Sequence, residues 1–178
     1  MKVNIVNEGI KWGSINGLIA VLLMYGSWAA GLNTFVSFQF WGNFVPFMIA
    51  ILIFAGLQIK KQNDGLLPFS QALKFTFLSY VVVAVITAIA TYVLYNLIDK
   101  ELTQKSVQVG LEKTRAMMEK FGASEDDIEK AMKSGMEEGA KGTGFSKILL
   151  GTGLFLIWDF IKSLLISLVI RKEEKFVD

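Results

Sequence analysis

The sequence predicts an all-α fold, an integral membrane four-helix bundle with an amphipathic two-helix polar loop between spans 3 and 4. Of the 178 residues, 53% are hydrophobic and only 19% are charged, whereas a soluble domain has about 25% charged residues. The mean hydropathy is +0.48. A soluble chain of this size buries only about 70% of its unfolded surface, so much of this apolar content would face water.

Four apolar stretches are each long enough to cross a bilayer. They cover about residues 12–32, 40–59, 75–98 and 148–170. A helix of about 20 residues spans a hydrocarbon core of about 30 Å. The first stretch has a second interpretation as a signal peptide, with Lys2 and Lys11 in its basic region and a cleavage motif at 27–29. Glu8 and the continuation of the apolar run to Leu32 favour a span.

Short connections join the first three spans. Residues 33–39 form an uncharged loop between the first two. Asn63-Asp64-Gly65 is a strong turn signal, and Pro68 follows it just before the third span. The sequence therefore predicts a tight hairpin over residues 60–67.

The distribution of basic residues predicts the orientation. With four spans, both termini and the 60–67 hairpin share one side of the membrane. Their short segments carry Lys2, Lys11, Lys60, Lys61, Arg171, Lys172 and Lys175. By the positive-inside rule this side is cytoplasmic, although the long loop on the other side also holds nine basic residues, diluted among ten acids.

The polar loop, about residues 99–147, has the pattern of two amphipathic helices. Val107, Leu111, Met118 and Phe121 recur at helical spacing, as do Ile128, Met132 and Met136. Gly122 is expected to end the first helix, and Ser124 to cap the second with Asp127 as its capping-box partner. Four glycines predict a flexible return to the fourth span: Gly135, Gly139, Gly142 and Gly144.

The favoured interpretation of the loop is structural: its two apolar stripes pack together or against the ends of the spans. Its acids at Glu125, Asp126, Asp127 and Glu129 lack the spacing of a calcium loop, so a capped helix start explains them better than a cation site. The sharper alternative is a partner-binding surface.

The fourth span contains two ionisable residues, Asp159 and Lys162, three residues apart on one helix face. Asp159 is expected near the bilayer centre, where ionisable residues are functional candidates by default. It could be a proton or cation site or bind a polar head group. For a pair without a second acid nearby, the favoured interpretation is a self-compensating ion pair, or a protonated Asp159 hydrogen-bonded to Asn16, Thr87 or Thr91.

The start of the first span carries Gly9, Gly13 and Gly17. This small-xxx-small spacing lets another helix approach closely. It predicts a helix-packing face, either within the bundle or between subunits.

The residue inventory argues against catalysis. Without Cys or His there is no thiolate nucleophile, no Ser–His triad and no imidazole or thiolate metal site. We therefore expect no cofactor, no metal and no enzyme activity. We also expect no nucleic-acid binding, since no arginine-rich or aromatic-interleaved basic patch is present. The expected partners are the lipid bilayer and a second copy or another membrane protein. An oligomeric transporter or channel subunit using Asp159 and Lys162 is the alternative.

Several segments carry a family resemblance. They are the Gly9–Gly17 opening, Gly56-Leu57-Gln58-Ile59-Lys60-Lys61, the hairpin from Asn63 to Lys74, the Lys120–Ile128 connection, and the acidic position and Leu-Leu-Ile-Ser-Leu-Val-Ile-Arg-Lys ending of the fourth span. Together they resemble the bacterial membrane family catalogued as domain of unknown function 4199, with Pro68 and Ser70 where Ser and Gly are expected. The resemblance implies a four-helix protein of the bacterial cytoplasmic membrane and brings no activity.

Overall fold

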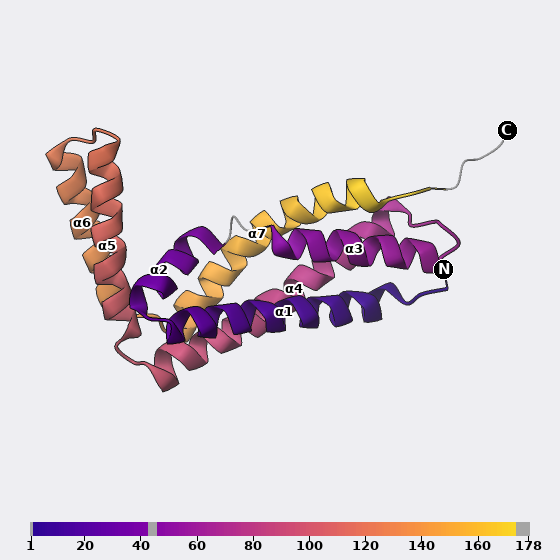
Figure 1. The fold of residues 1–178 in the computed structure, drawn as a ribbon, viewed down its shortest axis with the longest axis horizontal. Helices are drawn as coiled ribbons and strands as arrows, with labels where there is room; N and C mark the ends of the chain where they lie inside the picture. Colours follow the sequence, from indigo (N-terminus) through magenta and orange to yellow (C-terminus); the bar gives the residue numbers. More distant parts are fainter. Residues whose placement is uncertain (1, 43–45, 174–178) are drawn as a thin grey trace. The chain divides into compact units, whose positions relative to one another are not determined.

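A computed structural model describes residues 2–42 and 46–173. This part of the chain contains seven α-helices and no strand (Figure 1). They are α1 (Ile5–Ala29), α2 (Leu32–Trp41), α3 (Phe47–Gln62), α4 (Phe69–Val93), α5 (Leu102–Lys120), α6 (Glu125–Ala140) and α7 (Phe145–Ile170). The predicted all-α class is confirmed. Lys175, counted above among the basic residues of the C-terminal segment, lies outside the described residues.

Among the described residues, two helices are long and apolar enough to cross a membrane by length and composition. One runs over Phe69–Ile98, where α4 continues into a five-residue π-helical turn (Leu94–Ile98), and an 18-residue stretch of it has a mean hydropathy of 2.3. The other is α7, in which an 18-residue stretch has a mean hydropathy of 2.0. The third apolar stretch thus becomes helical six residues before its expected start, because Pro68 precedes the helix and its carbonyl accepts the first helical hydrogen bonds.

The expected loop at 33–39 is wrong, because these residues lie inside α2. Gly31, at φ +108°, ends the preceding segment, and Phe35 and Val36 are buried on the inner side of the helix. The apolar stretch at 40–59 is accordingly represented by α3, which has 16 residues. The burial of Phe35 and Val36 against residues of other segments, rather than a periodic pattern in the sequence, accounts for the helix.

The chain divides into two compact units. The first comprises the described parts of 1–22, 44–89 and 149–178, and contains α3 with most of α1, α4 and α7. Its core includes Leu52, Phe75, Tyr80, Ile166 and Ile170. Three sequence-distant segments meet at one end of this unit. The Asn63 side chain accepts hydrogen bonds from the backbone N–H groups of Lys2 and Val3, and an antiparallel bridge joins Leu67 to Lys172.

The second unit comprises residues 23–43 and 90–148 as far as they are described. Phe35 and Val36 of α2 pack with Leu94 and Leu102. Helix α2 lies against α5, where the Lys113 ammonium donates to the Ser37 hydroxyl at 2.5 Å. Helices α5 and α6 form an antiparallel hairpin (Figure 1).

The caps of the hairpin follow the sequence prediction, with one change in geometry. Helix α5 ends just before Gly122, which has φ +75°, and Ser124 is the N-cap of α6. The Ser124 hydroxyl oxygen accepts from the Asp127 N–H at 3.2 Å and its O–H donates to the Asp127 carboxylate at 2.6 Å. The Asp127 carboxylate therefore accepts a hydrogen bond from the Ser124 hydroxyl group. In a capping box it would instead accept one from the backbone N–H of Ser124.

Two of the four loop glycines do not belong to a flexible return. Gly135 and Gly139 lie inside α6 and face α5, where an added Cβ would stand 2.5 Å from Leu111 Cδ2 and 2.7 Å from the methyl groups of Val107. They are needed for close helix approach. Only Gly142 and Gly144 lie in the connection to α7.

Candidate functional site

Asp159 and Lys162 form an ion pair on one face of α7. The Asp159 Oδ1–Lys162 Nζ distance is 2.5 Å, and the two side chains are 16% and 23% exposed. The spacing of three residues places the two groups one helical turn apart, which is why they meet without help from another element.

Tyr80 of α4 covers the Lys162 side of this pair. The Lys162 ammonium lies 4.8 Å from the centroid of the Tyr80 ring, a cation–π distance. Tyr80 is buried, and its hydroxyl has no hydrogen-bond partner among the described residues. The ammonium is thus held between one carboxylate and one aromatic face.

A hydroxyl cluster continues the polar interior beside the pair. Ser163 donates to the Asp159 carbonyl at 2.7 Å within α7. The Thr76 hydroxyl of α4 lies 3.0 Å from the Ser167 hydroxyl and 3.3 Å from the Ser163 carbonyl. All three hydroxyl side chains are buried, so they join α4 to α7 through hydrogen bonds inside an apolar bundle.

None of the three predicted partners of Asp159 contacts it. Thr87 donates to the Val83 carbonyl at 2.9 Å, Thr91 contacts a methionine sulfur, and Asn16 has no hydrogen bond among the described residues. Sequence reasoning missed Tyr80, Thr76 and Ser163. Their signal is the spacing of four between Thr76 and Tyr80 and between Asp159 and Ser163, which puts each pair on one face.

The glycine face of α1 lies against α4. A Cβ added at Gly9 would stand 3.0 Å from Leu78, one at Gly13 would stand 2.7 Å from the Ser79 carbonyl oxygen, and one at Gly17 would stand 2.9 Å from Ile86. The Ser79 hydroxyl also donates to the Gly9 carbonyl at 3.1 Å. Residue numbers rise together along the two helices in these contacts, so α1 and α4 run in the same direction. This face is therefore used within the first unit.

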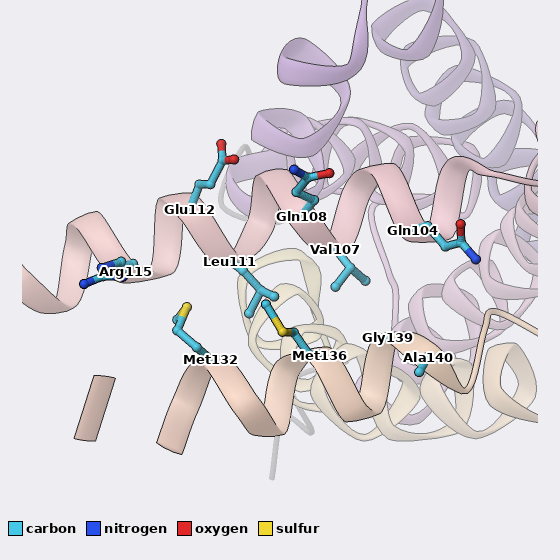
Figure 2. A pocket seen from close by; sticks show the side chains of 10 residues that line it. All are labelled: Gln104, Val107, Gln108, Leu111, Glu112, Arg115, Met132, Met136, Gly139 and Ala140. Atoms are coloured by element: carbon cyan, nitrogen blue, oxygen red, sulfur yellow. The ribbon is translucent and has the colours of Figure 1, made fainter. Parts of the chain in front are cut away.

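The α5–α6 hairpin carries an open groove of about 620 Å³ (Figure 2). Its walls are largely apolar, and Figure 2 shows Leu111, Val107, Met132 and Met136 between the two helices. The remaining lining residues are Gln104, Gln108, Glu112, Arg115, Gly139 and Ala140. Met136 is 63% exposed although it belongs to the apolar stripe of α6.

Ion pairs stabilise both ends of the hairpin. Arg115 binds Glu119 at 2.8 Å and Glu125 at 3.1 Å, and the hydrogen bond that it donates to Glu119 is the main cause that raises the Arg115 pKa. Near the other end Glu138 pairs with Lys141, whose hydrogen bond lowers the pKa of the Glu138 carboxyl. The rim is therefore charged under neutral conditions while the groove floor is apolar.

The ion pair and its surroundings suit helix association and charge compensation better than metal or cofactor chemistry. Asp159 is a single carboxylate whose Oδ1 is already engaged by an ammonium, whereas Ca²⁺ takes six to eight oxygen ligands. No cluster of three or more acidic side chains that could hold a metal occurs in the part of the chain that the structure describes.

Comparison with known proteins identifies the family. No curated protein and no solved structure matches the chain. Residues 11–172, which include every helix except the first turns of α1, match the family described as "Protein of unknown function (DUF4199)". The resemblance inferred from the sequence motifs is confirmed, and the chain belongs to this family.

Proposed function

We propose that this chain is a non-enzymatic, four-span protein of the bacterial cytoplasmic membrane, with both termini cytoplasmic, that assembles with a second copy through the α5–α6 hairpin. The four spans are α1, α3, α4 and α7. The hairpin then projects from the opposite side of the membrane.

The observation that carries the membrane proposal is the inverted polarity of α7. Its buried residues include Ser163 and Ser167, while eleven large apolar side chains between Leu149 and Val169 are 41–69% exposed. In water this exposure is an aggregation hazard. In lipid, small and hydroxyl residues belong at helix contacts and large apolar residues face the acyl chains.

Helices α1 and α3 are weaker evidence for membrane spans than α4 and α7, and α3 is short for a span. Helix α3 has 16 residues, which gives about 24 Å at 1.5 Å per residue, less than a hydrocarbon core of about 30 Å. Lys60 and Lys61 in its last turn can extend toward the headgroups, and the bilayer can thin locally.

The orientation is supported by the end of the first unit where Asn63 and the Leu67–Lys172 bridge gather the N-terminal segment, the α3–α4 turn and the end of α7. These are the short basic segments that the positive-inside rule assigns to the cytoplasm.

The charges on the α5–α6 hairpin favour self-assembly as its function. Helix α5 has four basic and two acidic residues, and α6 has six acidic and two basic residues. When two grooves face each other about an axis parallel to the helices, α5 of one copy lies opposite α6 of the other. This arrangement covers the apolar floor and sets opposite charges together.

Cysteine labelling tests the topology, because the natural sequence contains no Cys. Single Cys residues at Lys61, Ser124 and Lys172 are treated in intact cells with an impermeant thiol reagent. We expect labelling only at position 124. Labelling at 61 or 172 would contradict the orientation, and a chain that carbonate extracts from membranes would contradict the spans.

Cross-linking tests the assembly. We expect Met136→Cys, in the groove, to form a covalent dimer under mild oxidation in membranes. Ser134→Cys is the matched control, because it is exposed and lies on the other side of the same helix. Equal yields from both variants, or none from Met136→Cys, would refute the hairpin dimer.

A second candidate function is a subunit of an oligomeric transporter or channel. It is favoured by the largely buried Asp159–Lys162 pair and by the buried polar atoms of Asn16 and Tyr80 in the same unit, which have no hydrogen-bond partner among the described residues. In that case wild-type protein in liposomes conducts ions or protons, and Asp159→Asn abolishes the flux without unfolding the protein. Absence of wild-type flux, or flux unchanged by Asp159→Asn, would reject this candidate.

A further inference from the structure

Three basic residues, Lys60, Arg171 and Lys172, lie near the ends of α3 and α7 in the first unit. The two helices pack so closely at Gly56 that an added Cβ would stand 2.4 Å from Ile170 Cδ1. Lys60 lies one turn beyond Gly56 on the same face, and Arg171 and Lys172 directly follow Ile170. The contact that joins the helices therefore places these three residues at the same end of the unit.

Backbone and ring contacts hold two of these cations in position. Lys172 exchanges two hydrogen bonds with Leu67, from the Leu67 N–H at 2.9 Å and to the Leu67 carbonyl at 2.8 Å. The Arg171 guanidinium carbon lies 6.0 Å from the centroid of the Phe69 ring at the start of α4. The backbone of Lys172 is thus held at the α3–α4 turn, with its Nζ 4.0 Å from a Cβ placed on Gly65, and the Arg171 side chain lies at the start of α4.

These cations lack acidic partners. Lys60, Arg171 and Lys172 form no ion pair among the described residues, while Asp64 and Glu8 at the same end of the unit are engaged by Lys2 and Lys11 at 2.9 and 2.8 Å. Glu173 is exposed and pairs with none of the described cations. The ends of two helix dipoles offset only about half a charge each. A net positive charge remains.

We propose that this cluster of Lys60, Arg171 and Lys172, the basic junction, binds the phosphate group of an anionic phospholipid. The inference rests on the proposed spans, because these place the junction at the headgroup layer beside lipid-facing apolar helices. Phosphate oxygens match the planar donor fork of arginine, and the two lysines add charge without competing for that geometry. Phosphatidylglycerol is the probe.

The test titrates the purified full chain in a nonionic detergent with phosphatidylglycerol or phosphatidylcholine of the same acyl chains, and counts bound lipids by native mass spectrometry. We expect selective retention of phosphatidylglycerol. Replacing Lys60 and Arg171 by Gln should weaken its binding about fivefold for each cation removed. The control replaces Lys130 and Lys133 of α6, which also form no ion pair with any described residue, and should leave binding unchanged.

Three results would overturn the proposal. They are equal binding of the two lipids, an equal loss in the α6 control, and displacement of the lipid by an equal concentration of inorganic phosphate. A charge-conserving Lys60→Arg, Arg171→Lys variant should bind phosphatidylglycerol far better than the Gln variant, which separates loss of charge from loss of fold. Carbonate extraction of the wild type measures the spans independently, so a retained protein without lipid selectivity rejects only this inference.

Discussion

Gly13 lies against the backbone of α4, and Gly13→Ala measures how much the α1–α4 contact contributes to stability. The added Cβ would stand 2.7 Å from the Ser79 carbonyl oxygen, 2.8 Å from Val82 Cβ and 3.0 Å from Ser79 Cα. Carbon atoms pack best at about 3.5–4.0 Å. Two of the three contacts are with backbone atoms, so no side-chain rotation removes them and α4 must move away.

The expected loss is about 2 kcal/mol. Overpacking a tight site costs about 1–3 kcal/mol, and the movement also weakens the hydrogen bond from Ser79 to the Gly9 carbonyl, now 3.1 Å. Gly9→Ala should cost less, because the three atoms nearest its Cβ, at 3.0–3.2 Å, all belong to the Leu78 side chain rather than to backbone. Unfolding by sodium dodecyl sulfate in mixed micelles, followed by far-ultraviolet circular dichroism, provides the free energy of unfolding.

Gly26→Ala is the matched control in the same helix. No atom lies within 4 Å of its added Cβ, so the substitution should stabilise α1 by up to about 1 kcal/mol through the lower entropy of the unfolded chain. If Gly13→Ala were as stable as Gly26→Ala, the close α1–α4 approach would be refuted.

Three further predictions concern the ion pair and the hairpin. Asp159→Leu or Lys162→Leu alone should destabilise the protein by about 3 kcal/mol, because each leaves an unpaired charge, whereas the double Leu variant should recover most of the loss. Additive losses in that double-mutant cycle would argue against the pair. Ser124→Ala should cost about 1 kcal/mol by removing the N-cap, with faster amide exchange at the start of α6 as the readout. Unchanged exchange would contradict the cap. The hydrogen bond from Lys141 lowers the pKa of Glu138 below its ordinary value of 4.5, so its contribution to hairpin stability is present at neutral pH and is lost as the pH falls through that lower pKa. Glu138→Gln should reduce the acid sensitivity of amide exchange in α6, and an unaltered pH profile would contradict this.

The helical class and the hairpin were predictable because their signals are local. Ser124 can cap a helix and Gly122 can adopt a positive φ without any tertiary contact. The same holds for Asp159 and Lys162, whose spacing of three brings them together on one helix. Membership of the family followed from motifs distributed along the whole chain.

The predictions that were wrong concern residues with two possible structural roles, which only their neighbours in the folded chain distinguish. Gly135 and Gly139 are flexible in isolation, yet inside α6 they allow contact with Leu111 and Val107. Phe35 lies in a segment without charges or periodic contrast, so its burial, and with it α2, was not visible in the sequence.

The sequence by itself determined that this protein is helical, that its apolar residues form long stretches, and that one ion pair lies within the last of them. These properties depend on composition and on spacing along one helix. Only the tertiary structure decided which faces meet. It set the glycines of α1 against α4, placed Tyr80 over Lys162, and packed Gly56 of α3 against Ile170 of α7. Helix pairing depends on side-chain packing between residues far apart in the chain, and a period of 3.6 residues specifies a face but not its partner.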